Sequence, residues 1–163
     1  MWQEKGFYQN EPDVIASMKE LEGIIEKFPD RFLQFSEEEI LHKPAPGKWS
    51  KKEILGHLID SALNNLKRFT EIQFLPEPYI VPSYDQDKLV QVNHYQQLPS
   101  AHLFQLWKTL NQQIIYVVKE IPSEKLPSQV NPRYDSNEMK NLGWIICDYV
   151  AHLQHHLKQI FPA

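Results

Sequence analysis

Apolar residues recur at three- and four-residue spacing in four stretches of the chain, and this spacing predicts four amphipathic α-helices. The first is expected from Pro12 to Phe35. Its apolar stripe consists of Val14, Met18, Leu21, Ile25, Phe28 and Phe32. Pro12 suits the start of a helix. Pro29 should kink this helix or end its regular part, because proline cannot donate the backbone hydrogen bond of a helix interior.

A capping motif marks the start of the second helix. Ser50 is followed three residues later by Glu53, an arrangement in which each side chain bonds the backbone N–H of the other residue. The helix should end near Leu75, because a proline follows it. The third helix is expected from about Ser100 to Ile121, and its apolar stripe is Leu103, Leu106, Leu110, Ile114 and Val118.

The fourth helix is expected over about residues 142–161, and the segments between the helices are rich in proline and polar residues. Residues 76–99 show no convincing period, and a connection of that length inside a domain is usually a functional loop. Four amphipathic helices without a strand signal predict an all-α fold, a four-helix bundle. The loops do not fix the order of the helices.

Length and composition suit one soluble domain covering residues 1–163, with 42% apolar and 23% charged residues. The formal net charge is −4 and the basic residues are scattered, which argues against nucleic acid as a main partner. No apolar run approaches the roughly 20 residues that span a bilayer. A single cysteine, Cys147, excludes an intrachain disulfide, and the N-terminus does not resemble a signal peptide. We therefore expect a cytoplasmic protein.

Histidines gather near the C-terminus in the run HLQHHL. His152 and His156 are four residues apart, so both project from one side of a helix and could share one metal ion. A third ligand must come from another element, and His57 in the second helix is the obvious donor. Two alternatives stay open: a hydrogen-bonded core histidine, and a histidine cluster that favours the negative end of the helix dipole.

A polar stripe continues from His57 along the second helix. Ser61, Asn64 and Arg68 lie within about 40° of His57 on a helical projection. The stripe is either a solvated face or, if His57 faces a metal, the lining of a cleft in which Arg68 could hold an anionic group. Asp60 could orient a ligand or act as a general base, although an exposed carboxylate is the simpler interpretation.

The last helix offers a further candidate. Asp148 lies one turn before His152 and could accept the second ring N–H of a ligand. Cys147 falls on another side of the helix and is expected in the core. The remaining histidines outside the HLQHHL run lie in or beside loops without convincing partners: His42, His94 and His102.

Three segments together resemble a known family. GKWSKKEILGHLIDSALNNLKRF is similar to the second helix of the DinB-like four-helix bundle superfamily, in particular its bacillithiol-transferase-like and metal-dependent hydrolase-like branch. DYVAHLQHHLKQI resembles the closing helix of that family, and PSYDQDKLVQVNHYQQLP resembles the Tyr-Asp-containing loop that follows its second helix. The resemblance covers nearly the whole chain.

The resemblance implies one divalent metal ion, zinc or nickel, bound by three histidines. The family's ligands map onto His57, His152 and His156, and His155 matches an additional histidine that is not normally a ligand. A homodimer is the implied assembly.

The implied activity is the activation of a small thiol for transfer to an electrophile. Hydrolysis by a metal-activated water is the alternative, and ligand binding without turnover is a third possibility. The substrate would be a small molecule, for thiol transfer a low-molecular-weight thiol. Arg68, Asn64, Tyr84 and Asp85 are the residues expected to orient it.

Overall fold

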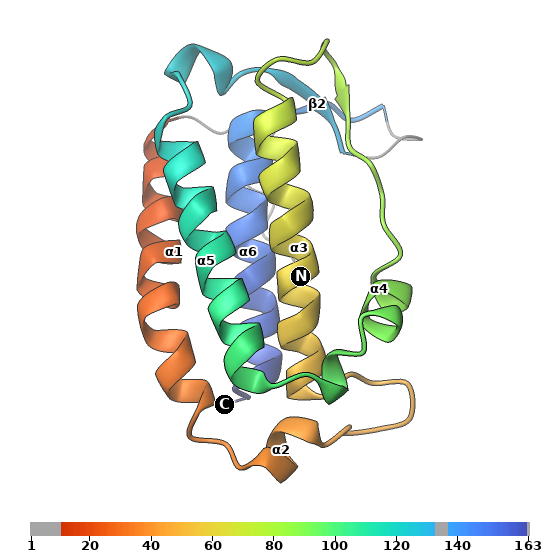
Figure 1. The fold of residues 1–163 in the computed structure, drawn as a ribbon. Coiled ribbons are helices and arrows are strands. Elements are labelled where there is room, and N and C mark those ends of the chain that lie inside the picture. Colours follow the sequence, from red (N-terminus) through yellow and green to blue (C-terminus); the bar gives the residue numbers. More distant parts are fainter. Residues whose placement is uncertain (1–10, 133–136, 163) are drawn as a thin grey trace.

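Four long helices form a bundle in the computed structural model, which describes residues 11–132 and 137–162 (Figure 1). The long helices are α1 (Glu11–Phe32), α3 (Lys51–Glu71), α5 (Ser100–Lys119) and α6 (Leu142–Ile160). Each corresponds to one predicted amphipathic segment, so the expected all-α four-helix bundle is confirmed. Within the described residues, no helix combines the length and apolar character that a membrane crossing requires.

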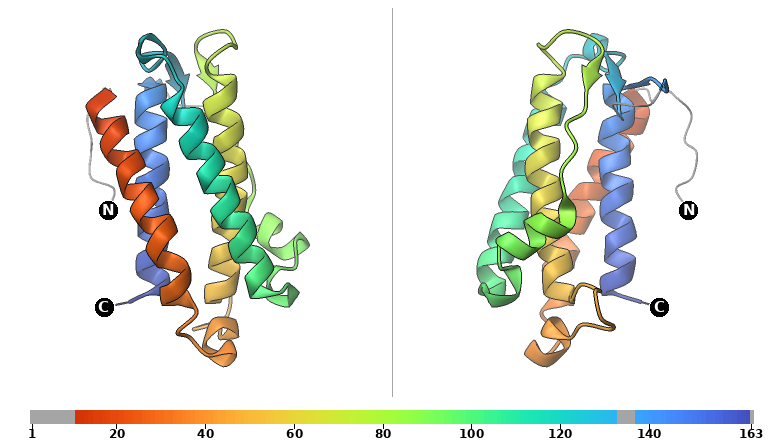
Figure 2. Two further views of the ribbon diagram at one scale, coloured as in Figure 1. Left: turned by 60° about the vertical axis from the view of Figure 1, so that its left-hand side comes forward. Right: turned by 90° about the vertical axis from the view of Figure 1, so that its right-hand side faces the viewer.

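The order of the helices around the bundle differs from their order in the chain. Both α1 and α3 pack against α5 and α6, so α1 and α3 lie diagonally across the bundle (Figure 2). The neighbours α3 and α6 run in opposite directions. This packing places the N-terminal half of α3 beside the C-terminal half of α6, two regions that are far apart in the sequence.

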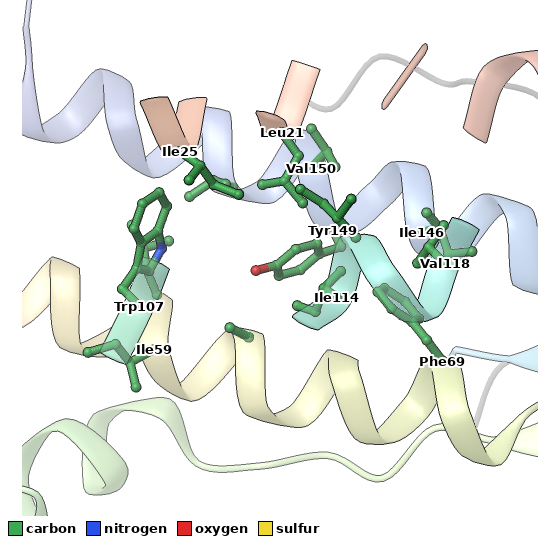
Figure 3. Close-up of a cluster of buried hydrophobic side chains, with 14 of the residues drawn as sticks. Leu21, Ile25, Ile59, Phe69, Trp107, Ile114, Val118, Ile146, Tyr149 and Val150 are labelled. Atoms are coloured by element: carbon green, nitrogen blue, oxygen red, sulfur yellow. The ribbon is translucent and has the colours of Figure 1, made fainter. Parts of the chain in front are cut away.

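The apolar stripes of the four helices meet in a common core (Figure 3). Leu21 from α1, Leu58 from α3, Trp107 from α5 and Ile146 from α6 are all fully or almost fully buried. Burial of one such side chain stabilises the fold by about 1.5–3 kcal/mol. The six residues of the predicted first stripe are all buried, which explains why periodicity located this helix correctly.

Local signals set the ends of the helices. Ser50 Oγ accepts a hydrogen bond from the Glu53 backbone N–H at 3.1 Å, and Glu53 Oε2 accepts one from the Ser50 N–H at 2.9 Å, so the predicted capping box is present. The predicted C-terminal ends of two helices were too late. α1 ends at Phe32, three residues after Pro29, and α3 ends at Glu71, after which the chain forms turns rather than continuing to Leu75.

The connections contain short elements that the sequence analysis missed. These are α2 (Glu37–Leu41), α4 (Gln86–Val92) and the 3₁₀ turns η1 (Tyr95–Gln97) and η2 (Ser123–Lys125). One or two turns are too short to display a helical period. A capping signal was nevertheless present for α2, because Ser36 and Glu39 repeat the motif of Ser50 and Glu53 and also form a capping box.

A small three-stranded sheet corrects the expectation of a chain without strands. It consists of β1 (Tyr79–Ile80), β2 (Gln129–Asn131) and β3 (Lys140–Asn141). β1 pairs parallel with β2, which pairs antiparallel with β3. Strands of two or three residues cannot show the alternation that identifies a strand in a sequence. The sheet joins two connections at one end of the bundle, and from β1 the chain runs along α3 toward α4 (Figure 2).

Candidate metal centre

Three histidines from two antiparallel helices meet inside the bundle. His57 Nε2 on α3 lies 3.3 Å from His152 Nε2 on α6, which in turn lies 3.1 Å from His156 Nε2. One donor atom from each of the three residues lies within 4.8 Å of the others. The structure therefore brings together the pair identified by its four-residue spacing and the predicted third residue from a different helix.

The spacing of these nitrogens fits a shared divalent ion. Two nitrogen ligands on one tetrahedral zinc ion lie about 3.3 Å apart, because each Zn–N bond is about 2.0–2.1 Å long. The observed separations of 3.3 and 3.1 Å are close to that value. Three converging imidazole nitrogens also match the donor set of catalytic zinc sites, in which the protein supplies three ligands. The residues present thus fit a divalent metal ion.

The surroundings orient two of the rings. His57 is 0 % exposed, and the indole of Trp49 lies against it with 4.8 Å between ring centroids. His156 Nδ1 lies 2.8 Å from Gln159 Oε1, which can only accept, so Nδ1 carries the proton and donates it. The Nε2 atom of His156 therefore presents a lone pair to the cluster, as metal binding requires.

Burial keeps the three imidazoles neutral. Burial, followed by the neighbouring His156, lowers the pKa of His57 to about 4. Burial, and to a lesser extent the neighbouring His156 and His57, lowers the pKa of His152 to about 3. Burial also lowers the pKa of His156. All three rings are therefore neutral near pH 7, the form in which one ring nitrogen of histidine can bind a metal ion.

Asp60, one turn beyond His57, is buried, so the expectation of an exposed carboxylate was wrong. Its Oδ1 accepts hydrogen bonds from Tyr95 Oη at 2.5 Å and from Asn93 Nδ2 at 3.2 Å. Both partners come from the end of α4 and from η1, which lie 33 and 35 residues away in the chain. Burial raises the pKa of Asp60.

Two buried polar atoms beside the cluster have no hydrogen-bond partner among the described residues. They are Nδ1 of His57 and Oδ2 of Asp60. The Nδ1–H of a metal-ligating histidine is ordinarily donated to a carboxylate, a carbonyl or water. Asp60 is the nearest carboxylate to His57 along α3, but the two atoms do not bond each other in this structure, and the orienting role of Asp60 stays a prediction.

The polar stripe of α3 is not a solvated face. Ser61 is buried, and Asn64 and Arg68 are partly buried. Arg68 donates to the carbonyl of Pro82 at 2.7 Å, and its guanidinium lies 5.6 Å from the ring centroid of Tyr84. The segment between β1 and α4 therefore covers the stripe. Asn64 donates to its own helix, at the carbonyl of residue 60, at 2.9 Å.

Arg68 is a partly buried cation that no described carboxylate neutralises directly. Burial lowers its pKa, and within residues 11–132 and 137–162 no carboxylate oxygen lies within 4.0 Å of it. Asp148 on α6 is partly buried, and burial raises the pKa of that carboxyl to about 6 against a weaker opposing effect of Lys140 and Arg68. Opposite charges thus face each other between α3 and α6 on the side of the cluster toward the sheet.

The other candidates from the sequence have distinct positions. Asp85 is exposed and caps α4 by accepting from the Lys88 N–H at 3.0 Å, which gives that side chain a structural role. Cys147 is buried in the core, as expected. His155 is exposed. The histidines for which the sequence offered no partners are also exposed and do not belong to the cluster: His42, His94 and His102.

Sequence analysis missed several neighbours of the cluster. Trp49 and Gln159 contact ligand candidates directly, while Tyr95 and Asn93 hold Asp60. For Gln159 a signal was present, since it follows His156 by three residues on one helix. For Tyr95 no sequence signal was present, because it lies 35 residues from Asp60 and reaches it only in the folded chain, where its ring packs against Gly56.

Two curated proteins are similar to this chain over most of its length. The chain is 22% identical over 153 residues to a "putative metal-dependent hydrolase" of Halalkalibacterium halodurans, covering 94% of this chain and 87% of that protein. It is equally similar, at 22% over 153 residues, to a protein of the same description from Oceanobacillus iheyensis, covering 91% and 83% of the two chains.

A solved structure has the same fold. YfiT from Bacillus subtilis, described as "a probable metal-dependent hydrolase with an unusual four-helix bundle topology", superposes with a TM-score of 0.82 at 17% identity. The match covers 96% of this chain and 91% of YfiT. Residues 20–160 match the model of the DinB superfamily, which confirms the resemblance seen in the sequence. The chain therefore belongs to the DinB superfamily.

Proposed function

We propose that this protein is a metal-dependent hydrolase in which His57, His152 and His156 hold one divalent ion, zinc or nickel. The convergence of their Nε2 atoms, 3.1 and 3.3 Å apart, is the observation that carries the proposal. The descriptions of the two curated relatives and of YfiT support it. A donor set made only of nitrogens suits zinc and nickel better than manganese or iron.

The neutrality of the three ligands decides what such a site can do. Because no ligand carries a negative charge, a bound ion keeps its full double charge, and three protein ligands leave coordination positions open. When bound, such an ion supplies Lewis acidity, which acidifies a water or thiol and polarises the bond under attack. The buried surroundings of His57 strengthen every electrostatic interaction at the site.

Asp60 is the proposed proton acceptor or orienting group beside the ligands. Its Oδ1 is held by Tyr95 and Asn93, which leaves Oδ2 to act. Burial raises the pKa of this carboxyl above its ordinary value, which makes it a stronger base. Either role, accepting a proton from the nucleophile or accepting a hydrogen bond from Nδ1–H of His57, uses that same oxygen.

Arg68 and Asn64 are the proposed substrate-orienting residues. The guanidinium of Arg68 has five N–H donors, of which the bonds to Pro82 and Asn65 use two. The remaining donors suit an anionic group on a small substrate, with Tyr84 beside it. We therefore propose that the substrate carries a carboxylate or a phosphate at some distance from the bond that is cleaved.

Replacement of Arg68 by alanine is expected to raise KM about 10- to 100-fold without loss of metal, because a hydrogen bond to a charged group contributes about 1.5–3 kcal/mol. Lys67→Ala is the matched control, since it removes a neighbouring positive charge that points to solvent and pairs only with Glu71 on its own helix among the described residues. Steady-state kinetics of both variants measure the difference. Equal KM values in the Arg68→Ala and Lys67→Ala proteins would show that Arg68 does not bind the substrate.

The proposed function is tested by assaying zinc- and nickel-loaded protein against esters, amides and phosphoesters that carry an anionic group. Hydrolysis without added thiol that is lost in His152→Ala protein supports a hydrolase. Thiol transfer to an electrophile rests on the sequence resemblance and on the same neutral donor set. Product formation that consumes a low-molecular-weight thiol would support that second function instead.

Absence of turnover in both assays by protein that does bind metal would favour ligand binding without catalysis. The homodimer and the cytoplasmic location stay predictions from the sequence, and light scattering of the purified protein would test the first of these.

A further inference from the structure

A short chain of hydrogen bonds links His156 to His155 through one glutamine. The side-chain oxygen of Gln159 accepts from His156 Nδ1 at 2.8 Å, and the side-chain nitrogen of Gln159 lies 3.4 Å from His155 Nε2. All three residues lie on one side of the last turns of α6. His155 is the histidine of the HLQHHL run that the proposed metal centre does not use.

The direction of the Gln159 amide determines the tautomer of His156. With its oxygen toward His156, the amide can only accept, so Nδ1 carries the proton and Nε2 presents a lone pair to the cluster. In the reversed amide, the NH₂ group would donate to Nδ1 and the proton would lie on Nε2. That proton would point at His152 Nε2, only 3.1 Å away, and would block metal binding.

His155 distinguishes between these two directions. In the direction that the structure shows, the amide nitrogen donates to His155 Nε2 across the 3.4 Å contact, so the proton of His155 lies on Nδ1. A reversed amide would place its oxygen against that acceptor, and the bond would be lost unless His155 also moved its proton to Nε2. Reversal of the amide therefore requires both histidines to change tautomer, and the direction in the structure is the one that leaves His156 ready to bind a metal ion.

We propose that Gln159 and His155 are positioning residues that fix His156 in its metal-binding tautomer. This inference rests on the proposed metal site but concerns metal affinity rather than turnover. It also gives a reason for an amide at position 159. A carboxylate there would make His156 a stronger ligand but would place a negative charge beside the site, whereas an amide orients the ring and adds no charge.

Zinc affinity, measured by competition with a chromophoric chelator, tests the proposal. Gln159→Leu is expected to weaken zinc binding about 10-fold, the lower end of the range for such outer partners, because Gln159 is exposed. Gln159→Glu is expected to bind zinc at least as tightly as the wild type. Gln112→Leu, the same change at an exposed position of α5, is the matched control and should bind like the wild type.

A double-mutant cycle isolates the role of His155. His155→Ala alone should weaken zinc binding a few-fold, because the amide of Gln159 can then reverse. In a chain that also carries Gln159→Glu, the same change should have little further effect, since a carboxylate has two equivalent oxygens and needs no orientation. An equal loss of zinc affinity from His155→Ala in the wild-type chain and in the Gln159→Glu chain would contradict the proposed role, because independent sites give additive effects.

Further results distinguish a failure of this inference from a failure of the proposed metal site. Nitrogen NMR of the metal-free wild type should show His156 protonated at Nδ1, and a proton on Nε2 would overturn the inference. Unchanged zinc affinity in Gln159→Leu protein would overturn it while leaving the proposed metal site intact. A wild type that binds no zinc would overturn both. Circular dichroism of each variant checks that α6 remains helical.

Discussion

Replacing His152 by alanine is expected to weaken zinc binding about 10²–10³-fold. Zinc sites with four protein ligands have apparent binding free energies of about 10–16 kcal/mol, which corresponds to about 2.5–4 kcal/mol for each ligand. His152 lies at the centre of the cluster, since its Nε2 is the atom within 3.3 Å of both other histidines. Hydrolytic turnover should fall to background with the loss of the ion. The fold should persist, because His152 is partly buried and lies outside the apolar core.

The control for this prediction is His102→Ala on α5, which removes an exposed histidine away from the cluster. Chelator competition and turnover assays on both variants, with circular dichroism to verify folding, make the comparison. His102→Ala should match the wild type in all three. Equal zinc affinity in the two variants would show that His152 is not a ligand.

Gly56→Ala is expected to lower the free energy of unfolding by about 1–5 kcal/mol, the net of two costs and of the roughly 1 kcal/mol by which a helix favours alanine over glycine, and the largest stability effect that we predict. An added Cβ at this position would lie 2.1–2.7 Å from three atoms of the Tyr95 ring. Overpacking of this kind costs about 1–3 kcal/mol. Displacement of Tyr95 would also remove its 2.5 Å hydrogen bond to buried Asp60, at a further cost of about 1–3 kcal/mol.

Gly23→Ala on α1 is the matched control, because an added Cβ at that position would have no contact within 4 Å among the described residues. Alanine is favoured over glycine in a helix by about 0.8–1.0 kcal/mol, so this variant should be more stable than the wild type. Urea unfolding of the two variants should therefore give changes of opposite sign. A stabilised Gly56→Ala protein would mean that Tyr95 does not pack on α3 as described.

Periodicity predicted the four long helices because their apolar stripes are also the core, as the buried residues of α1 illustrate. It failed for α4 and the three strands, since such short elements are stabilised by tertiary contacts. The bond from Asn93, at the end of α4, to Asp60 is one such contact, and the pairing of Tyr79 with Val130 is another. Neither leaves a local pattern.

The candidate site was predictable only in part for a related reason. The i, i+4 spacing of His152 and His156 specifies a shared helix face, but the meeting with His57 depends on the antiparallel packing of α3 and α6. The burial of Asp60 could not be predicted from its neighbours in sequence, because the residues that cover it come from η1 and the preceding turn.

The most direct test of the central claim is the metal content of untagged protein, measured by mass spectrometry for the wild type and for His57→Ala. We expect about one equivalent of zinc or nickel in the wild type, as three converging imidazoles require, and almost none in the variant. Little metal in the wild type even after reconstitution, or an equal amount in both proteins, would contradict the account.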